Sequence, residues 1–85
     1  MKSLTRFEIV DEQGKPVTDA GLTVVRSSVG AFPEMTAVPD ERGIVTLFLP
    51  AGRFTLRAVA PGDRAAEVTI ETPARASETV RIELS

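Results

Sequence analysis

The chain has 85 residues, contains no Cys, His, Trp, Tyr or Asn, and carries a formal net charge of −2 from 10 basic and 12 acidic residues. This length supports one hydrophobic core and therefore a single domain, residues 1–85. Its interspersed charges offer no basic surface for nucleic acid, and the missing residue types exclude disulfides, thiolate metal sites and the side chain most often used as a general base.

The first residues lead directly into a strand pattern, and no long apolar run follows anywhere in the chain. We therefore expect neither a signal peptide nor insertion into a membrane. A full-length chain of this kind would be cytoplasmic, whereas a domain taken from a larger secreted protein would have the same appearance.

Alternation of apolar and polar residues predicts seven short β-strands and no helix. The first strand, Leu4–Val10, turns Phe7 and Ile9 to one face and Arg6 and Glu8 to the other. The later strands are expected at Val17–Val25, Glu34–Val38, Gly43–Leu49, Arg53–Val59, around Val68 and Ile70, and at Glu78–Leu84. Gly and Pro residues mark turns between several of these segments, a spacing typical of a β-sandwich.

The segments at 53–59 and 67–71 are predicted to pair as an antiparallel hairpin. With their outward faces aligned, this pairing would place arginines opposite glutamates and one threonine opposite another: Arg53 with Glu71, Thr55 with Thr69, and Arg57 with Glu67. Such cross-strand pairs stabilise an exposed face. They would account for these arginines without any ligand.

The strand at 43–49 is the one that breaks the alternation. If Val45, Leu47 and Leu49 point inward, Ile44 and Phe48 must lie on the outer face of their sheet. The alternative is that they are ordinary isolated apolar residues or are covered by a loop.

Together with Val10 on the neighbouring strand, Ile44 and Phe48 form a candidate apolar patch for binding a partner. A second candidate is the loop at 27–35, which is unusually apolar and contains Phe32 and Met35.

Catalytic and metal-binding residues are poorly represented. Ser27, Ser28 and Ser77 have no histidine to activate them, so an enzyme is not expected. The acidic pairs at 11–12 and 40–41 lie in turns that favour Asp for capping the backbone, and neither turn supplies the convergent oxygens of a calcium loop. We expect no metal and no cofactor.

Three segments carry a family resemblance: VDEQGKPV at 10–17 followed by AGLTV at 20–24, DERGIVTL at 40–47, and LPAGRFTL at 49–56. Together they resemble the carboxypeptidase regulatory-like domains, which are transthyretin-like (prealbumin-like) β-sandwiches. Phe54 stands where this family usually has Tyr, and Asp63 follows a glycine that an aromatic residue often follows. The resemblance implies an all-β, seven-stranded Greek-key sandwich, with the first, fourth and seventh strands in one sheet and the other four in the second.

The resemblance also implies a non-catalytic protein-interaction or structural accessory module of bacterial type. Its partner would be another protein, another domain or a second copy of the chain. The alternative is an accessory domain that binds carbohydrate or peptide, by strand addition or through its loops. Two chemistries of similar folds do not fit, because the chain lacks the Asn of a Lys–Asn isopeptide bond and the histidines of the transthyretin-related hydrolases.

Overall fold

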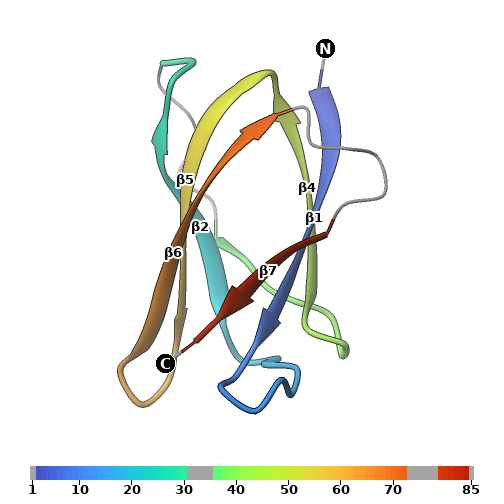
Figure 1. The fold of residues 1–85 in the computed structure, drawn as a ribbon, viewed down its shortest axis with the longest axis vertical. Helices are drawn as coiled ribbons and strands as arrows, with labels where there is room; N and C mark the ends of the chain where they lie inside the picture. The colour runs from blue at the N-terminus through green and yellow to red at the C-terminus, as the bar shows by residue number, and fades with distance from the viewer. Residues whose placement is uncertain (1, 31–35, 73–78, 85) are drawn as a thin grey trace.

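The structure is a computed structural model that describes residues 2–30, 36–72 and 79–84. Within these residues the chain forms seven strands and no helix (Figure 1). The strands are β1 (Lys2–Val10), β2 (Gly21–Ser27), β3 (Thr36–Ala37), β4 (Ile44–Pro50), β5 (Gly52–Ala60), β6 (Arg64–Thr72) and β7 (Thr79–Glu83). No helix in the described ranges is long and apolar enough to cross a membrane.

The strands form a sandwich of two sheets. One sheet has the order β4-β1-β7, and the other has the order β3-β2-β5-β6. β1 is antiparallel to β4 and parallel to β7, while the pairs in the second sheet are all antiparallel. The division of strands between the sheets and the all-β Greek-key sandwich predicted from the sequence are both confirmed.

The core lies between the two sheets. Phe7 on β1 and Phe54 on β5 are fully buried and are its largest side chains, and aliphatic residues of both sheets surround them. The inward positions of β1, β4 and β5 are those that the alternation predicted, including Ile9, Leu49 and Leu56. Burying such side chains is the main favourable contribution to folding.

The predicted strand at Val17–Val25 begins too early. Val17 and Ala20 are buried, but β2 starts at Gly21. The backbone N–H of Val17 instead donates to the carbonyl of Ile9 in the other sheet, 2.9 Å away. Residues 17–20 therefore cross from one sheet to the other. Their apolar side chains are buried in the core, although their backbone is not part of a strand.

Candidate interaction surface

The outer face of the three-stranded sheet carries the predicted apolar patch. Strand register brings Phe48 of β4 directly opposite Leu4 of β1. Phe48 is 65% exposed and Leu4 is 50% exposed. We call these two residues the Leu4–Phe48 patch.

The structure modifies the predicted membership of the patch. Phe48 is exposed as expected, whereas Ile44 is half-buried and lies opposite Glu8 rather than opposite an apolar residue. Val10 is only 2% exposed, so its inclusion in an exposed patch is wrong.

Val10 lies at the end of β1, where two other segments pair with its backbone. Pro16 forms an isolated bridge with Val10, and the N–H of Leu84 donates to its carbonyl over 2.8 Å. Leu4 was missed, although it shares the alternation of Arg6 and Glu8 and could have been placed on the outer face for that reason. The second predicted site, Phe32 and Met35, lies outside the described residues.

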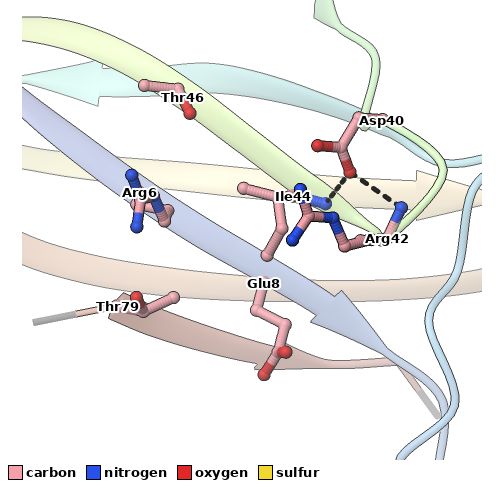
Figure 2. A pocket seen from close by; sticks show the side chains of 7 residues that line it. All are labelled: Arg6, Glu8, Asp40, Arg42, Ile44, Thr46 and Thr79. Atoms are coloured by element: carbon pink, nitrogen blue, oxygen red, sulfur yellow. Dashed lines mark hydrogen bonds between the residues drawn. The ribbon is translucent and has the colours of Figure 1, made fainter.

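A polar depression of about 550 Å³ lies on the same outer face, next to β4. Figure 2 shows Arg6 of β1 and Arg42 of the turn before β4 on either side of Ile44. Thr46 and Thr79 also line the depression. Glu8 and Asp40 also contribute to the lining, so positive and negative side chains are equal in number. The depression is therefore charge-balanced and does not by itself indicate an anionic ligand.

Two turns at one end of the sandwich share one geometry, the turn at 11–15 and the turn at 40–44. In each, the Asp side chain accepts hydrogen bonds of 2.8–3.0 Å from the backbone N–H groups two and four residues later. The glycines at their fourth positions, Gly14 and Gly43, have φ values of +82° and +78°, which favour glycine.

These hydrogen bonds hold the pKa of each turn carboxylate below its usual value. For Asp11 the N–H of Lys15 has the largest effect, and for Asp40 that of Ile44. The Asp side chains thus cap the backbone. Among the described residues, no group of three or more acidic side chains could hold a metal ion.

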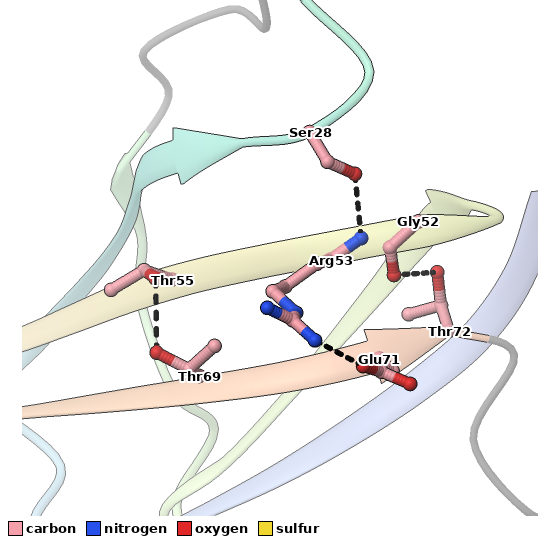
Figure 3. A network of polar contacts seen from close by, with 7 residues as sticks. All are labelled: Ser28, Gly52, Arg53, Thr55, Thr69, Glu71 and Thr72. Atoms are coloured by element: carbon pink, nitrogen blue, oxygen red, sulfur yellow. Dashed lines mark hydrogen bonds and ion pairs between the residues drawn. The ribbon is translucent and has the colours of Figure 1, made fainter.

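The outer face of the four-stranded sheet carries the predicted polar ladder (Figure 3). Arg53 lies 2.7 Å from Glu71, Arg57 lies 2.8 Å from Glu67, and the Thr55 and Thr69 hydroxyls are 3.0 Å apart. All three pairs are confirmed in the predicted register. On this face, arginines are used to pair strands.

The loop serines have structural roles where the structure describes them. The hydroxyl of Ser28 accepts the backbone N–H of Arg53 over 2.8 Å, and that of Ser27 accepts the N–H of Val29 over 3.2 Å. Ser28 also lines a second depression of about 420 Å³, together with Arg53 and Glu71. Their side chains already form the ion pair described above.

No protein-family model matches this chain, and a search of curated proteins finds no match either. The surface must therefore be interpreted from its own geometry.

Proposed function

We propose that this domain is a non-catalytic protein-interaction or structural module of the carboxypeptidase regulatory-like, transthyretin-like kind. It docks another protein, another domain or a second copy through the outer face of the β4-β1-β7 sheet. The observation that carries the proposal is the Leu4–Phe48 patch, an exposed aromatic side chain placed beside an exposed leucine near one end of the outer face. Aromatic side chains are enriched among the residues that contribute most to binding at interfaces.

The contrast between the two sheets supports this choice. Outward arginines of β5 are paired with glutamates of β6. On the β4-β1-β7 face, Arg6 has threonines as its register neighbours on both sides, Thr46 and Thr79. Among the described residues, side chains on this face form fewer hydrogen bonds and ion pairs with one another, so the face is better suited to interactions with a partner.

The family assignment is supported by the sheet composition, since the resemblance implied the same division of strands that the chain adopts. The alternative function, binding of a peptide by strand addition, would use the same sheet. Its β4 strand lies at one edge.

Site-specific photo-crosslinking tests the proposal. A photoreactive phenylalanine analogue replaces Phe48 in one variant and Val59 in a control variant, and each is expressed in cells of the natural host. Val59 is a suitable control because it is 47% exposed on β5 of the other sheet. We expect discrete crosslinked products from position 48 alone. No product from position 48, or the same products from both positions, would refute the proposal.

A Phe48→Ser variant shows whether Phe48 serves binding or folding. Because the side chain is 65% exposed, its loss should change the free energy of unfolding by no more than about 0.5 kcal/mol. Destabilisation of several kcal/mol in urea titrations would show that Phe48 belongs to the core.

A further inference from the structure

The open edge of the three-stranded sheet is formed by β4, which pairs with β1 on one side only. Free strand edges present unpaired backbone groups and usually carry a protective feature such as a charge, a bulge or an internal proline. β4 has the sequence IVTLFLP, with no charged residue and proline only at its last position, and its register with β1 is continuous.

The other edges of the sandwich are better protected. β3 has two residues, β6 contains Glu67 and Glu71, and β7 contains Arg81 and Glu83. Among the described strands, β4 is therefore the edge most open to pairing with another chain.

The register with β1 determines which backbone groups of β4 face outward. In an antiparallel pair, alternate residues direct both their N–H and C=O groups to the partner strand. The N–H of Ile9 donates to the carbonyl of Gly43, so odd-numbered residues of this segment face β1. Ile44, Thr46, Phe48 and Pro50 then direct their backbone groups to the open edge.

Two of these four residues already have partners within the chain. Asp40 accepts the N–H of Ile44 and donates its own N–H to the Ile44 carbonyl. Pro50 has no N–H, and its carbonyl accepts the hydroxyl of Thr72. Thr46 and Phe48 remain, and no described residue pairs with their outward backbone groups.

This pattern is complementary to itself. A two-fold axis at Leu47 places Thr46 of each copy opposite Phe48 of the other, so that four hydrogen bonds join the outward N–H and C=O groups of these two residues in both copies. Shifting the register by two residues in either direction would require groups of Ile44 or Pro50 that are already bonded. One register is therefore favoured over its neighbours.

Side chains favour the same arrangement. The two Phe48 rings would lie diagonally across the new strand pair, each beside its own Leu4, within the reach of aromatic side chains. Leu47 is half-buried on the inner face and would lie directly opposite Leu47 of the second copy. No charge on β4 opposes the approach of a second copy.

We propose that two copies of this chain pair through their β4 edges, in antiparallel orientation about Leu47, to form one continuous six-stranded sheet. The proposal rests on the proposed function in assigning a second copy as the partner of the Leu4–Phe48 patch. A second copy fits better than an unrelated extended segment, because it satisfies the same backbone groups and also brings the Phe48 side chains of the two molecules within reach of each other. The contact is isologous and closes as a dimer.

Sedimentation velocity over low-micromolar to millimolar concentrations of the full chain tests the proposal, using Thr46→Lys as the disrupting variant. Thr46 is exposed, so the substitution adds an edge charge without altering the core. Thr79→Lys is the matched control, because it adds the same charge at an exposed position on the opposite edge of the same sheet. We expect the wild type and Thr79→Lys to dimerise and Thr46→Lys to dissociate at least about tenfold more readily.

Hydrogen exchange measured by NMR identifies the surface used. The amides of Thr46 and Phe48 should exchange quickly in dilute protein and become protected as the concentration rises, while those of Val45 and Leu47 stay protected throughout. A chain that is monomeric at all concentrations would overturn the proposal, as would a dimer that is insensitive to Thr46→Lys. Crosslinking of position 48 to a different protein would still support the proposed function. Failure of the dimer proposal is therefore distinguishable from failure of the proposed function.

Discussion

Thr5 gives the sharpest test of how the core is built. It lies on the inner face of β1 and is 1% exposed, and its hydroxyl has no hydrogen-bond partner among the described residues. An unpaired buried polar group costs about 1–3 kcal/mol. Thr5→Val removes the hydroxyl with little change of shape and should therefore raise the free energy of unfolding by an amount in that range.

Thr72→Val is the matched control, because the same substitution should have the opposite sign there. Thr72 is 8% exposed, and its hydroxyl donates to the carbonyl of Pro50 and lies 3.3 Å from that of Gly52. Losing this bond should lower stability by about 0.5–1.5 kcal/mol, or more if the Pro50 carbonyl stays unpaired.

Urea titrations give both free energies, and thermal melts check them, because a domain of this size shifts by about 4–8 °C per kcal/mol. Destabilisation by Thr5→Val would refute the reasoning. It would show that the hydroxyl has a hydrogen-bond partner beyond the described residues.

Three further predictions concern the turns and the polar ladder. Gly43→Ala should destabilise the fold by about 1–3 kcal/mol, and by more than Gly62→Ala. Both glycines have positive φ, but only at Gly43 would the added Cβ meet a neighbour, the Ile9 carbonyl at 2.8 Å. Equal losses of unfolding free energy in urea titrations would contradict the close contact. Since folding lowers the pKa of Asp11 and of Asp40, their stabilisation should be complete above the usual value of 3.8 and lost as pH falls through and below it. Unfolding free energies measured against pH should thus fall less steeply in acid for the Asp11→Asn, Asp40→Asn double variant, and identical profiles would exclude this role. A double-mutant cycle on Arg57 and Glu67 should give a coupling of about 0.2–1 kcal/mol, because both side chains are about half exposed; zero coupling would mean that the ion pair does not stabilise the face.

The strand alternation and the short β5–β6 connection made much of this structure predictable. Alternation is a local property, so the buried faces of β1, β4 and β5 followed from neighbouring residues alone. The pairing of Arg57 with Glu67 followed because a tight turn at 61–63 fixes the register of a hairpin. The capping roles of the turn aspartates also depend on residues at most four positions away.

The interaction surface could be predicted only in part, because it depends on segments that are distant in sequence. Leu4 and Phe48 become neighbours through a register between strands more than thirty residues apart. Val10 is buried at the end of β1, where its backbone pairs with Pro16 and Leu84. The sequence determined the outward direction of Phe48 by itself, since side chains alternate along any strand. Only the tertiary structure decided that Leu4 lies beside Phe48 in the exposed patch and that Val10 does not. It also decided that β4 lies at a sheet edge with Thr46 and Phe48 open to a partner. The reason is that non-local hydrogen bonds set the order of strands in a sheet.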